Sequence, residues 1–143
     1  MKIQNILATK GTGVVTVKSD DSLREAVALL AKFDIGGLVV VDEARRPVGI
    51  ITERDIVRQA ADSEAFFSRP VHEVMTTAVT IATPEDEIES VARTMSEKRF
   101  RHLPIIDQGR LVGIVSIGDV VRAQRDHFQG EVYTLHAQMI EEH

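Results

Sequence analysis

Two short segments of this sequence share a pattern of side chains that suits ligand binding. Residues 48–58 and 112–122 are identical at six of eleven positions, and each carries a hydroxyl residue followed three places later by an aspartate. The pairs are Thr52 with Asp55 and Ser116 with Asp119. Where a strand meets a helix, a hydroxyl can donate to a phosphate or ribose oxygen, and a carboxylate one turn later can accept from ribose hydroxyls. The repeat therefore suggests two equivalent sites.

The same spacing has a purely structural interpretation. A Ser or Thr followed three residues later by an acidic residue is also a capping box, which satisfies backbone N–H groups at the start of a helix. For a single copy, the helix cap is the simpler interpretation. The glycine before each pair, Gly49 or Gly113, allows a backbone or a ligand to approach closely.

A cluster of potentially cationic side chains stands out in a chain whose formal net charge is −5. Its members are Lys98, Arg99, Arg101 and His102. The first two are interpreted as stabilising the negative, C-terminal end of the preceding helix. The last two lie at one end of the next expected strand, and a strand end that faces a crevice is a common ligand position in α/β folds. The matching residues in the first half are Gly36 and Gly37, so we expect a phosphate clamp from the second half alone.

Composition excludes several classes of protein. The chain has no cysteine, which rules out disulfides, thiolate catalysis and cysteine-ligated zinc. No histidine spacing resembles a metal site, and no catalytic triad, P-loop or GxGxxG turn is present. We therefore expect no enzyme activity, and no metal beyond Mg²⁺ carried by a nucleotide. The acidic composition does not suit a nucleic-acid partner. No signal peptide or membrane span is found, so we expect a cytoplasmic protein with no membrane partner.

Apolar periodicity changes in the same order in both halves of the chain. A short strand comes first, then a helix with apolar residues at i, i+3, i+4 and i+7, then two strands and a closing helix. The expected strands are 14–17, 38–41 and 48–51 in the first half and 78–81, 103–106 and 112–115 in the second. The closing helices are 53–60 and 117–125. The sequence thus predicts an α/β (α+β) fold in which one β-α-β-β-α unit occurs twice.

The duplication divides the chain into four parts. These are residues 1–60 as the first repeat, 61–70 as a linker, 71–125 as the second repeat and 126–143 as a C-terminal helix. Repeats of this size bury little core alone, so we expect them to pack through their sheets. In the tail, Val132, Leu135, Met139 and Ile140 have helical spacing. This spacing fits either packing on the same domain or contact with a second subunit.

These features resemble a tandem pair of CBS domains (cystathionine-β-synthase domains), called a Bateman module. The resemblance covers residues 1–124 and rests on the duplicated element order and on Gly-x-x-[Ser/Thr]-x-x-Asp in both halves. It also rests on Arg-His-Leu-Pro-Ile-Ile-Asp at 101–107 and on Val-x-Glu-Val-Met-Thr at 71–76. The first repeat departs from the pattern at Val39, where the second has Pro104.

The resemblance implies two repeats packed with pseudo-twofold symmetry, as a regulatory module that binds AMP, ADP, ATP or NAD in clefts between them. An S-adenosylmethionine-type ligand is an alternative. The aspartates would hold ribose, the hydroxyls ribose or phosphate, and the isoleucines adenine. The backbone at 35–37 would read adenine beside Asp119, and that at 100–102 beside Asp55. The implied ligand-binding residues are Thr16, Ile35, Gly36, Gly37, Ile50, Thr52, Arg54, Asp55, Thr80, Phe100, Arg101, His102, Leu103, Pro104, Ile114, Ser116 and Asp119.

The resemblance also implies partners. Small modules of this family usually form a homodimer, a disc of four CBS units, and signal to a regulated protein that the sequence does not identify. A carboxylate on the ribose disfavours the 2′-phosphate of NADP by charge repulsion. Which nucleotide binds each cleft stays open, and so does a structural or dimerisation module in which the hydroxyl–aspartate pairs only cap helices.

Overall fold

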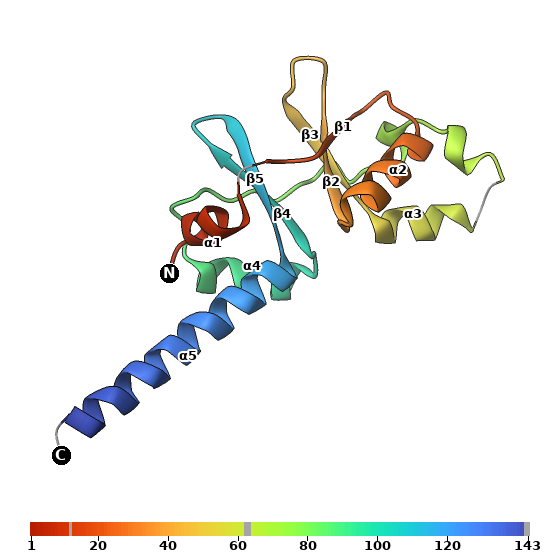
Figure 1. Cartoon of the computed structure of the whole chain (residues 1–143). Helices are drawn as coiled ribbons and strands as arrows, with labels where there is room; N and C mark the ends of the chain where they lie inside the picture. Colours follow the sequence, from red (N-terminus) through yellow and green to blue (C-terminus); the bar gives the residue numbers. More distant parts are fainter. Residues whose placement is uncertain (12, 62–63, 142–143) are drawn as a thin grey trace.

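The computed structural model describes residues 1–11, 13–61 and 64–141 and shows two α+β units side by side (Figure 1). The first contains β1 (Thr16–Lys18), α2 (Leu23–Phe33), β2 (Gly37–Val41), β3 (Pro47–Thr52) and α3 (Glu53–Ala60). The second contains α4 (Ile88–Lys98), β4 (His102–Asp107), β5 (Arg110–Ser116) and α5 (Ile117–Glu141). The remaining elements are α1 (Ile3–Lys10) and two 3-10 turns, η1 (Phe66–Ser68) and η2 (Val71–Glu73). The predicted fold class is confirmed.

The two sheets differ by one strand. β1 pairs parallel with β2, and β2 pairs antiparallel with β3, whereas the second sheet has only the antiparallel pair β4–β5. The strand predicted over 78–81 is wrong, because the chain there forms only an isolated bridge between Ala82 and Ile105. Pro104 has no N–H to extend this ladder. Its counterpart Val39 pairs within the β1–β2 ladder.

The strand register makes the two hydroxyl–aspartate pairs equivalent in space. Gly37 faces Thr52 across β2 and β3, and His102 faces Ser116 across β4 and β5. The helix that follows each hydroxyl residue is tied to the residue before the neighbouring strand. These bonds run from Glu53 N to Gly36 O at 3.0 Å and from Ile117 N to Arg101 O at 2.8 Å. The matching of the two halves that was inferred from the sequence therefore holds in the backbone.

The N-terminal segment of each repeat, which we call its lead-in segment, packs on the other repeat. Helix α1 belongs to the core of the second unit through Ile3, Ile6 and Leu7, and the connection after α3 belongs to the core of the first unit through Phe66 and Val71. The spatial units therefore do not follow the two halves of the chain, and this exchange ties the repeats together.

Two glycines make room for this exchange. A Cβ at Gly49 would lie 2.8 Å from the carbonyl oxygen of Thr76, and one at Gly113 would lie 2.5 Å from a methyl carbon of Leu7. Ile50 and Thr76 form a backbone bridge, with N···O distances of 3.0 and 2.9 Å. The close approach expected at these glycines is thus an approach of the protein's own lead-in segments.

Helix α5 is continuous from Ile117 to Glu141, where the sequence predicted a helix at 117–125 and a C-terminal helix within 126–143. Its first turns pack on the second core, where Val120 is fully buried, and its remainder extends away from both units (Figure 1). Among the residues that the structure describes, no helix is long and apolar enough to cross a membrane.

Candidate functional site

The first hydroxyl–aspartate pair caps helix α3. The Asp55 N–H donates to Thr52 Oγ1 at 3.3 Å, and the Thr52 N–H donates to Asp55 Oδ2 at 3.0 Å. The Thr52 hydroxyl also donates to Asp55 Oδ2, at 3.0 Å. The capping box is complete, so this pair has a structural role whether or not a ligand binds.

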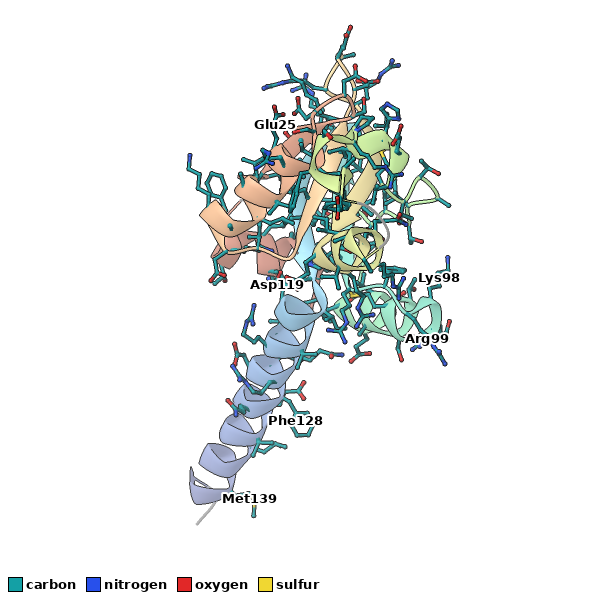
Figure 2. All side chains as sticks on the ribbon, turned by 90° about the vertical axis from the view of Figure 1, so that its right-hand side faces the viewer. Glu25, Lys98, Arg99, Asp119, Phe128 and Met139 are labelled. Atoms are coloured by element: carbon teal, nitrogen blue, oxygen red, sulfur yellow. The ribbon has the colours of Figure 1, made fainter. Side chains whose placement is uncertain are left out.

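The second pair forms the same box at the start of α5. The Ser116 N–H donates to Asp119 Oδ2 at 2.9 Å, and the Asp119 N–H donates to Ser116 Oγ at 3.1 Å. Figure 2 shows Asp119 at the near end of this helix. The two boxes agree in their backbone geometry, and the difference between them lies in what surrounds the aspartates.

The Asp119 carboxylate is held by two cations of its own chain. Lys10 Nζ lies 2.6 Å from Oδ2, and an Arg122 guanidinium nitrogen lies 2.8 Å from Oδ1. Lys10 also donates to the carbonyl of Ile114 at 2.8 Å. Burial would raise the pKa of Asp119, but the hydrogen bonds from Lys10 and Ser116 outweigh it and hold that pKa below its usual value. The ammonium group of Lys10 thus pairs with the carboxylate that was expected to hold the second ribose.

Asp55 instead faces a cavity of about 510 Å³ between the two repeats, a volume in the range of small-molecule sites. Helix α3 and the end of β3 form one wall, and the chain between α4 and β4 forms the other. The lining residues are Gly36, Ile50, Thr52, Glu53, Arg54, Asp55, Val57, Arg58, Thr76, Arg99, Phe100, Arg101 and His102.

The charges around this cavity favour an anionic ligand. Four arginines line it, against two carboxylates, in a chain with a formal net charge of −5. The arginines are Arg54 and Arg58 on α3 and Arg99 and Arg101 before β4. Guanidinium groups suit phosphate because their N–H donors match two oxygens at once. No cluster of three or more potential metal ligands occurs among the described residues.

His102 contributes shape more than charge. A Cβ at Gly37 would lie 2.9 Å from its ring carbon Cγ, and one at Gly36 would lie 3.3 Å from Nε2. The imidazole therefore fits against two residues without side chains, which explains why the first repeat has glycines where the second has Arg101 and His102. The expected clamp of two cations is thus reduced to Arg101, since burial lowers the pKa of His102.

We expect His102 to make folding sensitive to mild acid. Burial is the largest cause of its lowered pKa and outweighs the opposing effect of Glu53. The unfolded chain takes up this proton near pH 6.5, whereas the folded chain takes it up only at lower pH. The free energy of unfolding should therefore fall as pH drops below about 6.5. Urea denaturation at successive pH values measures this slope, and His102→Gln should reduce it. An unchanged slope in the variant would contradict the assignment.

The structure brings together about half of the residues expected at a site. The predicted residues that line the cavity are Gly36, Ile50, Thr52, Arg54, Asp55, Phe100, Arg101 and His102. Those that do not are Thr16, Ile35, Gly37, Thr80, Leu103, Pro104, Ile114, Ser116 and Asp119. Leu103 and Pro104 are buried within the second unit. Lys10 contacts Asp119 and the carbonyl of Ile114, and Ser116 is hydrogen-bonded to Asp119.

Five lining residues were not among those expected from the sequence. They are Glu53, Val57, Arg58, Thr76 and Arg99. Arg58 lies one turn after Arg54, so helical spacing alone was a usable signal for it. Arg99 was interpreted as balancing the dipole of α4, but it takes a left-handed backbone conformation at φ 58° and lines the cavity. Figure 2 shows Lys98 and Arg99 together at the end of that helix.

Comparison with known proteins gives the same duplicated unit. A family model for the CBS domain matches residues 8–62 and 71–126. The CBS domain-containing protein YhcV of Bacillus subtilis is 32% identical over 118 residues, which cover 82% of this chain and 84% of that protein. Other relatives are longer: the chain spans 22% of an inosine-5′-monophosphate dehydrogenase of Aquifex aeolicus, to which it is 37% identical over 116 residues.

Solved structures resemble the whole arrangement. The CBS-domain containing protein ATU1752 from Agrobacterium tumefaciens superposes with a TM-score of 0.82 at 39% identity, covering 86% of this chain and 92% of that one. The CBS domain pair of protein MJ0100 has a TM-score of 0.78 at 32% identity, covering 92% of this chain and 98% of that one. That pair was solved in complex with 5′-methylthioadenosine and S-adenosyl-L-methionine.

Proposed function

The chain belongs to the CBS-domain family as a tandem pair of such domains, and from this premise we propose that it is a regulatory module that binds an adenine nucleotide. The observation that carries the proposal is the cavity beside α3, where four arginines, a helix-capping carboxylate and apolar side chains meet. We assign the nucleotide to this cavity first, and to the cleft at Asp119 only when Lys10 leaves it.

Each part of a nucleotide has a suitable partner in the cavity. Ile50 and Phe100 offer apolar surface for a base, and Asp55 can accept hydrogen bonds from ribose hydroxyls. The start of α3 carries the positive end of the helix dipole, which favours phosphate. Arg54 and Arg101 approach from the two opposite walls.

The chemistry of a neighbour supports the adenosine part of this proposal. The MJ0100 pair holds 5′-methylthioadenosine and S-adenosyl-L-methionine, so a related pair accepts an adenosyl group. S-adenosylmethionine carries a cationic sulfonium and no phosphate, whereas four arginines line the cavity of this chain. That charge favours AMP, ADP, ATP or NAD over S-adenosylmethionine here.

A ligand in this cavity would touch both repeats, because Asp55 belongs to the first and Arg101 to the second. Any difference in affinity between two arrangements of the repeats would then shift their populations. We propose that a partner protein recognises this shift. Ligand binding would thus be the signal that the module senses, and the relative position of the two units would carry that signal to the partner.

Calorimetric titration of the protein, after removal of any copurified ligand, tests the assignment. We expect binding of AMP, ADP, ATP or NAD, weaker binding of S-adenosylmethionine, and little binding of NADP, whose 2′-phosphate would face Asp55. Comparing AMP with 2′-deoxy-AMP isolates the ribose contact and should show weaker binding of the deoxy form.

A structural module is the second candidate, because both capping boxes are complete without a ligand. The two candidate functions predict different results in the same titration. If none of these ligands binds at millimolar concentration, nucleotide sensing is wrong and the hydroxyl–aspartate pairs serve only as helix caps.

A further inference from the structure

The outer half of α5 has no cover within the described part of the chain. Every residue from Gln124 to Val132 is exposed, as are Leu135 and Met139, and Figure 1 shows this half extending away from both units. In proteins, most of the stability of a helix comes from the packing of one apolar face against other elements. We therefore expect the outer half of α5 to pack against a second surface.

The exposed apolar side chains of α5 form one continuous stripe. Its members, with their exposed fractions, are Val121 (54%), Phe128 (67%), Val132 (53%), Leu135 (60%) and Met139 (62%). From Phe128 onward they alternate at spacings of four and three residues, which is the a/d pattern of a coiled coil. Arg125 takes the one remaining position. Figure 2 shows Phe128 and Met139 on the same side of the helix.

We propose that α5 pairs with α5 of a second copy of this chain as an antiparallel two-stranded coiled coil centred near Gly130. The stripe is self-complementary about this residue. Val121 and Met139 lie equally far from Gly130 in sequence, and so do Phe128 and Val132. An antiparallel pair thus places four of the five apolar residues against an apolar residue of the other copy, and Leu135 against Arg125, over about 27 Å of helix.

The position of Arg125 selects this orientation. In a parallel pair, Arg125 would meet Arg125 of the second copy in the core layer, and like charges in contact are unfavourable. In the antiparallel pair it meets Leu135 of the second copy, with Glu131 of that copy one turn away. Within one chain its guanidinium only pairs with the neighbouring Asp126, at 3.3 Å, through an exposed contact. The guanidinium can therefore reach past the leucine to Glu131 of the second copy.

Analytical ultracentrifugation of the full chain across a wide range of concentrations tests the pairing without any nucleotide. We expect a dimer, and we expect Leu135→Lys to raise its dissociation constant roughly a hundredfold, as for loss of a central interface residue. Gln124→Lys is the matched control, because it adds the same charge at an exposed residue of α5 outside the apolar stripe and should leave the dimer intact. Leu135 is exposed within one chain, so the variant should keep its fold, which circular dichroism verifies.

A monomeric wild-type chain would overturn the proposal and assign the stripe to a different protein. A dimer that Leu135→Lys leaves unchanged would overturn it too, since another surface would then hold the copies together. Orientation is tested by disulfide formation, because the chain has no cysteine of its own. Val121→Cys chains mixed with Met139→Cys chains should cross-link to each other. Efficient cross-linking of Val121→Cys chains among themselves would overturn the antiparallel arrangement.

Discussion

Asp55→Ala should weaken nucleotide binding about 10- to 150-fold, which corresponds to the loss of about 1.5–3 kcal/mol from hydrogen bonds to a charged group. The carboxylate lines the cavity and stands one turn into α3. Ribose hydroxyls that lose this acceptor have to bind water or remain unpaired. Calorimetric titration with AMP and ATP measures the effect directly.

Asp119→Ala is the matched control for this experiment. It removes the equivalent residue of the second capping box, so both variants should lose stability from the cap, and Asp119→Ala should lose in addition the ion pairs with Lys10 and Arg122. Only Asp55→Ala should lose affinity for the first nucleotide, because Asp119 does not line the cavity. If both variants lose stability and neither loses affinity, the carboxylates act as helix caps alone.

Lys10→Met should create a second binding event on the same chain. In the wild type a ligand at Asp119 has to displace an ammonium group that lies 2.6 Å from the carboxylate. Removing that competitor should strengthen binding at the second cleft about 10-fold or more, the scale of one charged hydrogen bond. Titration should then give two ligands for each chain in place of one tight site.

The control for Lys10→Met is Lys2→Met, which also removes a lysine of the N-terminal segment that pairs with a carboxylate. Lys2 contacts Glu85 at 3.0 Å on the exposed surface, so this variant should leave both clefts unchanged. A loss of affinity in Lys10→Met, in place of the expected gain, would also be informative. If Lys10→Met weakens binding at the second cleft, then Lys10 turns from Asp119 to the phosphate of the ligand, and it is part of the site instead of its competitor.

Much of the fold was predictable because it depends on short-range patterns. A hydroxyl three residues before an aspartate satisfies the N–H groups of a helix wherever the helix lies, so both caps were visible in the sequence. Alignment of the two repeats also predicted which residues occupy equivalent positions in their strands. Gly37 and His102 were matched by alignment of the two halves, and the structure places both opposite a hydroxyl residue.

The sequence predicted inequivalent clefts from Arg101 and His102 in one repeat against Gly36 and Gly37 in the other. The structure shows that the surroundings of the two aspartates differ. The stronger asymmetry is Lys10, on the N-terminal helix of the first repeat, whose ammonium contacts Asp119 in the second. Nothing in the local sequence of either residue connects them, since they lie 109 positions apart.

The amino-acid sequence was sufficient for the repeated unit, the two capping boxes and the family, because each depends on residues close together or on self-similarity along the chain. The packing of the two repeats set the rest. It brings each lead-in segment against a glycine of the other repeat, Gly49 or Gly113. It also places Lys10 on Asp119 and leaves Asp55 beside an arginine-lined cavity. Such contacts depend on the volume and charge of residues far apart in the chain, and they become defined only when the two cores close on each other.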